Sequence, residues 1–271
     1  MTPLHPAPAA VLLDMDGVLY EGDAVVPGAP EAVRWLREQG IPLLFLTNTS
    51  SRPRSALVAR LEALGIPARA HDLLTPPVAA ADWIRRHAPG PVALFVPEAT
   101  RADFAGVPLA GDETADVSAV VVGDLGPGWD FWTLNRAFRL LMQERRPRLV
   151  ALGLTRYWKV GDGLRLDVGP YVRALEYAAG VEAVVTGKPA AEFFRAAVER
   201  LGRPADTVVM VGDDIRGDVA AAQAAGIRGV LVHTGKFRPA DLELGITPCA
   251  QLDSIARLPG WWQEQAAEAG A

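Results

Sequence analysis

Short apolar runs alternate along much of the chain with longer segments in which apolar residues recur every three to four positions. Such runs are typical of strands that are buried on both faces of a parallel sheet. They lie at 11–13, 41–46, 181–186, 207–211 and 228–233. Helices are predicted at 30–39, 53–64, 190–201 and 219–225, and a glycine follows most of them. This alternation predicts right-handed βαβ units and a parallel, doubly wound sheet.

The middle of the chain is predicted to form a separate α/β unit. Strands are expected at 92–96, 117–122 and 149–154, and a helix at 130–144. Two further runs, 157–160 and 164–167, flank Gly161-Asp162-Gly163, a turn sequence that favours a β-hairpin. We therefore expect a Rossmann-like core made of residues 1–74 and 181–271, with residues 75–180 inserted as a cap domain.

Composition and charge exclude several classes of protein. Half of the residues are apolar and 22% are charged, which supports a buried core and argues against disorder. The net charge is −5, whereas nucleic-acid-binding proteins are usually basic. No apolar run reaches the roughly 18 residues of a membrane span. The single cysteine, Cys249, cannot form an internal disulfide, so we expect a cytoplasmic protein that binds neither nucleic acid nor membrane.

Asp14-Met15-Asp16-Gly17 places two carboxylates directly after the first predicted strand. In open α/β sheets, ligands bind beyond the carboxyl ends of the strands. A carboxylate there can attack phosphorus, and a second one can protonate the leaving group and later activate water. A plain turn explains the same residues about equally well, because Asp and Gly are common in turns.

Two other predicted strands end in residues that suit a phosphoryl group. Thr47-Asn48 offers a hydroxyl and backbone N–H donors, although such a pair is more often a helix cap. Lys188, in Gly187-Lys188-Pro189, can balance the charge of a transferring phosphoryl group. By itself, a surface lysine is the simpler interpretation.

Three carboxylates follow the predicted strand at 207–211, within Gly212-Asp213-Asp214-Ile215-Arg216-Gly217-Asp218. Carboxylates packed together repel one another unless they are protonated or neutralised by a cation. Mg²⁺ suits a site of one or two carboxylates and a substrate phosphate. An acidic turn in solvent is the alternative.

Taken together, the four motifs resemble those of the haloacid dehalogenase (HAD) superfamily. All four follow predicted strands of the alternating part, which independent surface turns would not do. The position of the cap resembles the C2-type branch, subfamily IIA, which includes the NagD-like phosphatases. Several segments are also similar to phospholysine phosphohistidine inorganic pyrophosphate phosphatases and their HAD-like relatives. These segments are Leu166–Tyr171, Ala174–Ala178, Gly187–Pro189, Gly212–Val219 and Thr234–Pro239.

The resemblance implies roles for the core residues. Asp14 is the nucleophile, and Asp16 is the general acid and then the general base. Mg²⁺ is held by Asp14, by the Asp16 backbone carbonyl and by Asp213. The phosphoryl group is bound by Thr47 and Asn48, with Lys188 balancing its charge. Asp218 orients Lys188 or a metal-bound water, and Asp214 is an alternative for that role.

We therefore expect a magnesium-dependent phosphatase that hydrolyses a small phosphorylated substrate, with a phosphoamidate or pyrophosphate as candidates. A phosphotransferase or phosphomutase on the same fold is an alternative, and a non-catalytic regulator that binds a phosphorylated ligand is another. The predicted hairpin of the cap is the candidate for contacting the leaving group, with Thr155, Arg156, Tyr157, Trp158 and Lys159. A homodimer formed through the cap is a further candidate.

Overall fold

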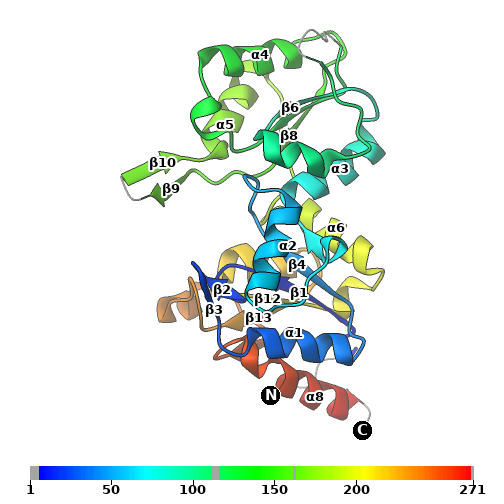
Figure 1. Cartoon of the computed structure of the whole chain (residues 1–271), viewed down its shortest axis with the longest axis vertical. Helices are drawn as coiled ribbons and strands as arrows, with labels where there is room; N and C mark the ends of the chain where they lie inside the picture. Colours follow the sequence, from blue (N-terminus) through cyan, green and yellow to red (C-terminus); the bar gives the residue numbers. More distant parts are fainter. Residues whose placement is uncertain (1–5, 112–115, 161–162, 270–271) are drawn as a thin grey trace. The chain divides into compact units, whose positions relative to one another are not determined.

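The computed structural model describes residues 6–111, 116–160 and 163–269. The chain forms two compact units, which are coloured along the sequence in Figure 1. Unit 1 comprises Met1–Thr47, Ser55–Leu74 and Lys188–Ala271, and unit 2 comprises Asn48–Arg54 and Thr75–Gly187.

Unit 1 is built on a six-stranded sheet in which every neighbouring pair of strands is parallel. Its order is β14-β13-β12-β1-β4-β5. The strands are β1 (Ala10–Asp14), β4 (Leu43–Leu46), β5 (Leu73–Leu74), β12 (Val208–Gly212), β13 (Arg228–Val232) and β14 (Ala250–Leu252). The chain runs outwards from β1 to one edge and later from β12 to the other edge. The carboxyl ends of β1 and β12 therefore flank the point where the direction of winding changes, where ligands bind in such folds.

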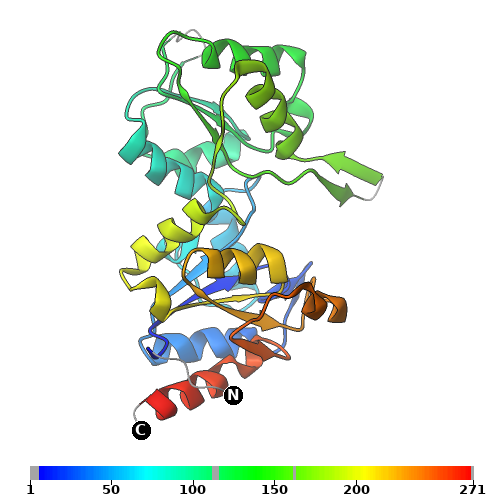
Figure 2. The same ribbon diagram turned by 180° about the vertical axis from the view of Figure 1, so that it is seen from behind.

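Helices cover both faces of this sheet (Figures 1 and 2). One face packs against α1 (Ala29–Glu38), α2 (Arg54–Ala63) and α8 (Leu258–Ala269), which supply much of the largest apolar cluster. The other face carries α6 (Ala191–Leu201), a single π-helical turn η5 (Ile215–Ala220) and the short α7 (Ala221–Ala224). All five residues of β1 are buried, because side chains on both of its faces contact helices. The strand is therefore continuously apolar in sequence.

Unit 2 repeats the three-layer design around a smaller parallel sheet of order β11-β8-β7-β6. These strands are β6 (Val92–Phe95), β7 (Ala119–Val122), β8 (Arg148–Ala151) and β11 (Val184–Val185). One face packs against α3 (Pro76–His87) and η2 (Glu98–Phe104), and the other against α4 (Phe131–Leu141) and α5 (Val168–Ala179). Alternate residues of β7 enter the two clusters, Val120 and Val122 on one face and Ala119 and Val121 on the other.

Shorter elements extend from both units. An antiparallel hairpin, β9 (Tyr157–Val160) and β10 (Gly163–Leu166), extends from unit 2, and β2 (Tyr20–Glu21) pairs with β3 (Ala24–Val25) in unit 1. The predicted turn residues Gly161 and Asp162 lie outside the described residues. The single helical turns are η1 (Ala70–Asp72), η3 (Gly126–Gly128), η4 (Ala205–Thr207), η6 (Pro239–Leu244) and η7 (Ile255–Arg257).

The predicted fold class, a doubly wound α/β core with an inserted α/β unit, is confirmed, and one local expectation is wrong. The apolar run at 181–186 forms only the two-residue strand β11, which pairs with β8 in unit 2 and not with the sheet of unit 1. Thr75-Pro76-Pro77, at the start of the inserted segment, begins the helix α3. The Thr75 hydroxyl accepts a hydrogen bond from the Val78 N–H (3.4 Å), and proline suits the first turn because that turn needs no N–H donor.

Candidate active site

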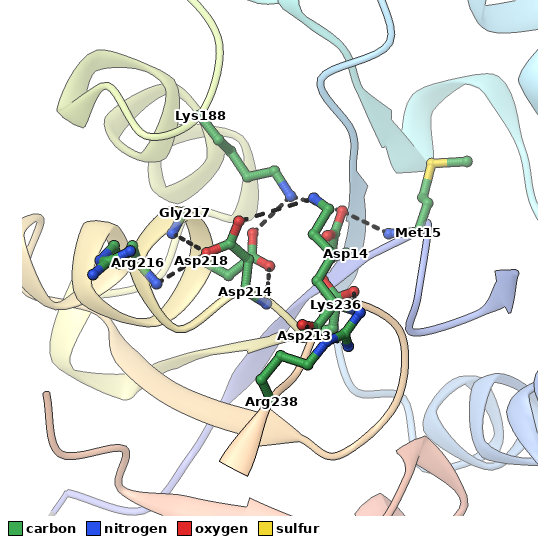
Figure 3. Close-up of polar contacts among 10 residues, drawn as sticks. All are labelled: Asp14, Met15, Lys188, Asp213, Asp214, Arg216, Gly217, Asp218, Lys236 and Arg238. Atoms are coloured by element: carbon green, nitrogen blue, oxygen red, sulfur yellow. Dashed lines mark hydrogen bonds and ion pairs between the residues drawn. The ribbon is translucent and has the colours of Figure 1, made fainter. Parts of the chain in front are cut away.

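Asp14 is the last residue of β1, and its side chain is only 6% exposed. The backbone N–H of Met15 donates to Asp14 Oδ1 (2.8 Å), and the same oxygen forms an ion pair with Lys188 Nζ (2.7 Å). Figure 3 shows both contacts. A short, buried strand therefore presents one carboxylate at the carboxyl edge of the sheet, with its orientation fixed by a backbone donor and a cation.

Lys188 bridges two carboxylates. Its Nζ lies 2.7 Å from Asp14 Oδ1 and 2.7 Å from Asp218 Oδ1, and all three side chains are buried. Burial opposes the charge on the ammonium group, but the two neighbouring carboxylates outweigh it and raise the pKa of Lys188 above its ordinary value. Lys188 is therefore a permanently charged group in a site of low polarity.

The acidic motif after β12 folds back on itself through the π-helical turn η5. Asp214 precedes this turn, and its Oδ1 accepts hydrogen bonds from the N–H groups of Arg216 (3.0 Å) and Gly217 (2.8 Å). A Cβ at Gly212 would lie 2.3 Å from the Cβ of Asp218. Only glycine at this position lets Asp218 return to the end of the strand. Burial is the main cause that raises the pKa of Asp218, and the neighbouring negative charge of Asp14 raises it further.

Asp213 lies in a cradle made by two glycines. A Cβ at Gly17 would lie 1.9 Å from Asp213 Oδ2, and one at Gly235 would lie 2.1 Å from the same atom. The Lys236 N–H donates to that oxygen (2.7 Å). Burial raises the pKa of Asp213 to about 6. Its other oxygen, Oδ1, is buried and has no hydrogen-bond partner among the described residues.

The three buried carboxylates form a cluster that can hold a divalent metal ion. Asp14, Asp213 and Asp218 each offer an oxygen within 4.8 Å of the others. Lys188 balances one of the three negative charges, so the charge that remains matches that of a divalent cation. A buried, unpartnered carboxylate oxygen is unfavourable without a ligand. The oxygen of Asp213 therefore supports a cation here, and oxygen ligands suit a hard ion such as Mg²⁺.

The other predicted core residues lie outside this cluster. Thr47 is buried at the end of β4 in unit 1, whereas Asn48 is the first residue of unit 2. Asp16 lies two residues beyond β1, where its side chain is exposed and its backbone bridges to Tyr20. Asp214 holds the turn η5 and lies 3.9 Å from Lys236 Nζ.

In unit 2, Arg156 is exposed, with its guanidinium 5.8 Å from the centre of the Tyr157 ring. The side chains of Trp158 and Lys159 lie outside the described residues. Of the five predicted hairpin residues, the structure thus describes the side chains of Thr155, Arg156 and Tyr157, and all three are exposed.

The loop after β13 contributes to the site and was not predicted to have a role. Lys236 donates its backbone N–H to Asp213, and Arg238 N–H groups donate to the carbonyls of Gly235 (3.2 Å), Lys236 (3.0 Å) and Phe237 (2.6 Å). The sequence did offer a signal for this role, because the loop follows the predicted strand at 228–233 and so lies at the same edge of the sheet as the other site residues.

Comparison with known proteins identifies the family. The model of the haloacid dehalogenase-like hydrolases matches residues 11–109, and a HAD-hydrolase-like model matches residues 185–258. The chain is 41% identical to the bovine haloacid dehalogenase-like hydrolase domain-containing protein 2, over 86% of each chain. The chain belongs to the haloacid dehalogenase-like hydrolase family. The predicted resemblance is therefore confirmed.

Other family members with similar sequences and folds are phosphatases. The chain is 40% identical to human phospholysine phosphohistidine inorganic pyrophosphate phosphatase, over 85% of each chain. Its fold matches that of the p-nitrophenyl phosphatase from Archaeoglobus fulgidus with a TM-score of 0.84 and 29% identity, covering 94% and 100% of the two chains. NagD from E. coli matches with a TM-score of 0.82 and 25% identity, covering 92% and 98%. These matches confirm the prediction of a hydrolase of the phosphatase class.

One finding bears on membrane association. Within residues 6–111, 116–160 and 163–269, no helix is long and apolar enough to cross a bilayer.

Proposed function

We propose that the chain is a magnesium-dependent phosphatase that works through an aspartyl-phosphate intermediate formed on Asp14. The observation that carries this proposal is the contact of Lys188 Nζ with Asp14 and Asp218, at 2.7 Å each, beside the unpartnered oxygen of Asp213. A buried nucleophilic carboxylate, a fixed cation and a carboxylate cluster suited to a metal are the groups that phosphoryl transfer requires.

In the first half-reaction, Asp14 attacks phosphorus. Both contacts of Asp14 use Oδ1, so Oδ2 is the oxygen that forms the new bond. The bond from phosphorus to the leaving group breaks as the acyl phosphate forms, and the exposed Asp16 gives its proton to the departing atom. In the second half-reaction, Asp16 takes a proton from a water molecule as the water oxygen attacks phosphorus. The bond between phosphorus and the Asp14 oxygen breaks, which releases inorganic phosphate and restores the Asp14 carboxylate.

Asp14, Asp213 and the Asp16 backbone carbonyl would hold Mg²⁺, which supplies Lewis-acid stabilisation of the phosphoryl oxygens when it is bound. The Lys188 ammonium adds a second positive charge, and Asp218 fixes its direction through their 2.7 Å contact. Thr47 and the Asn48 N–H are assigned to the phosphoryl oxygens. Asp14 and Asp16 are both present, which argues against a regulator that only binds a phosphorylated ligand.

The proposed substrate is a small phosphoamidate or inorganic pyrophosphate. Support comes from the human relative, whose name gives phospholysine, phosphohistidine and pyrophosphate. Because core residues recognise the phosphoryl group, selection of the leaving group is assigned to unit 2 as the cap, with Arg156 as a contact.

The lone Cys249 supports a cytoplasmic setting. A homodimer through unit 2 remains part of the proposal, and light scattering after gel filtration tests it.

The central experiment compares Asp14→Asn with Asp253→Asn, a matched change at an exposed carboxylate. Both proteins are incubated with Mg²⁺ and p-nitrophenyl phosphate or pyrophosphate. Asp14→Asn is expected to retain its thermal unfolding transition but lose turnover, and to lose the acid-stable phosphoryl adduct seen by intact-protein mass spectrometry after quenching. Normal turnover in folded Asp14→Asn would overturn the mechanism.

A further inference from the structure

A carboxylate outside the metal cluster is connected to Asp213 through the loop after β13. The N–H of Gly235 donates to Glu21 Oε1 (2.7 Å), and the N–H of the next residue, Lys236, donates to Asp213 Oδ2 (2.7 Å). Glu21 is exposed and lies in β2, more than 200 residues from this loop in sequence. Adjacent N–H groups of one loop are therefore fixed by Glu21 and by a proposed metal ligand.

The same loop has little room to move. The Thr234 hydroxyl donates to the Gly17 carbonyl (2.5 Å). A Cβ at Gly235 would lie 2.5 Å from the Cα of Gly17, so the two backbones are already in close contact. A shift of this loop would thus move the N–H that orients Asp213.

The hairpin that carries Glu21 is itself fixed to the body of unit 1. The guanidinium of Arg60, on α2, lies 4.3 Å from the centre of the Tyr20 ring. It also donates to the Gly22 carbonyl and lies 3.5 Å from Asp23 Oδ1. Glu21 therefore extends from a hairpin that Arg60 holds in place, and its hydrogen bond with the Gly235 N–H restricts the movement of the loop.

We propose that Glu21 is a positioning residue for the metal site, acting through Gly235 and Lys236 on the carboxylate of Asp213. This inference rests on the proposed function, because it takes Asp213 as a metal ligand. Without the Glu21 carboxylate, the Gly235 N–H loses its acceptor and the loop gains freedom. The Lys236 N–H then holds Asp213 less firmly, and the ligand must be ordered when the metal binds.

The test measures Mn²⁺ affinity by isothermal titration calorimetry on the full chain, with Mg²⁺ as competitor. Glu21→Ala is expected to weaken binding about tenfold, at the lower end of the roughly 10–100-fold range for outer partners of metal ligands. Glu21→Gln keeps an oxygen acceptor and should stay within about threefold of wild type, because neutral hydrogen bonds retain part of the strength of charged ones. Asp253→Ala removes the same charge from an exposed position of unit 1 that lies in neither the hairpin nor this loop, and should leave the affinity unchanged.

A second readout separates positioning from general damage. The Mg²⁺ concentration for half-maximal hydrolysis of p-nitrophenyl phosphate should rise in Glu21→Ala, while kcat at saturating Mg²⁺ and the unfolding transition of the metal-free chain should match wild type. Wild-type affinity in Glu21→Ala would overturn the inference and leave the proposed function intact. Equal weakening in Glu21→Ala, Glu21→Gln and Asp253→Ala would also overturn it, because charge alone would then be responsible. Absence of metal binding in wild type would refute the proposed metal site and the inference together.

Discussion

The glycine cradle around Asp213 yields a sharp prediction, because the chain contains a matched control. Gly235 has a φ of +63°, and a Cβ added there would lie 2.1 Å from Asp213 Oδ2. Gly245 has a φ of +73°, and a Cβ there meets nothing within 4 Å. Gly235→Ala and Gly245→Ala therefore share the strain of a left-handed backbone. They differ in that only the new methyl group at position 235 collides with Asp213.

The magnitudes follow from the geometry. A Cβ in the left-handed region costs roughly 1–2 kcal/mol, so Gly245→Ala should lose about that much unfolding free energy. Gly235→Ala should lose more, because its Cβ would also lie 2.5 Å from the Gly17 Cα. Ordinary contact begins at 3.4 Å, so the Asp213 carboxylate and the added methyl of Gly235→Ala must separate by about 1.3 Å more than the structure allows. A displacement of that size at a metal ligand is expected to lower metal affinity by about 10–100-fold.

The assay pairs calorimetric titration of Mn²⁺ with urea unfolding of the metal-free proteins. Gly245→Ala should bind Mn²⁺ like wild type despite its lower stability. Gly235→Ala should bind much more weakly, and its kcat/KM at a fixed, subsaturating Mg²⁺ concentration should fall in parallel. Equal Mn²⁺ affinity in the two variants would refute the reasoning that the glycine exists to admit the carboxylate.

Four further predictions address charge and burial. Lys188→Met leaves Asp14 and Asp218 buried without their cation, so the metal-free chain should lose about 3–5 kcal/mol in urea unfolding, and an undiminished unfolding free energy would contradict the ion-pair geometry. Mg²⁺ at one hundred times its Kd should raise the unfolding free energy by about 2.7 kcal/mol, an effect that EDTA reverses and that Asp213→Asn abolishes. Burial raises the pKa of Cys249 to about 11; iodoacetamide should therefore modify the folded chain at pH 8 about 100-fold more slowly than the unfolded chain. By the same linkage, the folded state retains the Cys249 proton between pH 9 and 11, so its stability should fall as pH rises through that window, and Cys249→Ala should remove this part of the decline.

The sequence was most informative where burial alone determines the pattern. β1 and β12 are buried along their whole lengths, and such strands are continuously apolar whichever neighbours they have. Their ends were predictable for the same reason. Asp14 is the last residue of β1, one position earlier than expected, and Asp213 directly follows β12. Both residues lie in the same buried cluster in the structure.

The pattern of apolar residues could not predict which distant segments pair with one another. The run at 181–186 is as apolar as a core strand, but Val184 and Val185 pair with Val150 and Ala151 of unit 2. Periodicity reports burial and not the identity of the neighbouring strand. The same limit applies to Glu21 and Gly235, whose contact joins two ordinary-looking turns with no local signal in either.

The position of Lys188 depends on contacts that the pattern of apolar residues does not report. The chain passes from unit 2 to unit 1 between Gly187 and Lys188, so no strand of the catalytic sheet precedes the lysine to position it. Its place is fixed instead by its ion pairs with Asp14 and Asp218, both in unit 1. A buried ammonium that lost these partners would be strongly unfavourable, so the ion pairs determine where the returning chain enters unit 1. The carboxylates proposed to act in catalysis thus also position the lysine proposed to assist them.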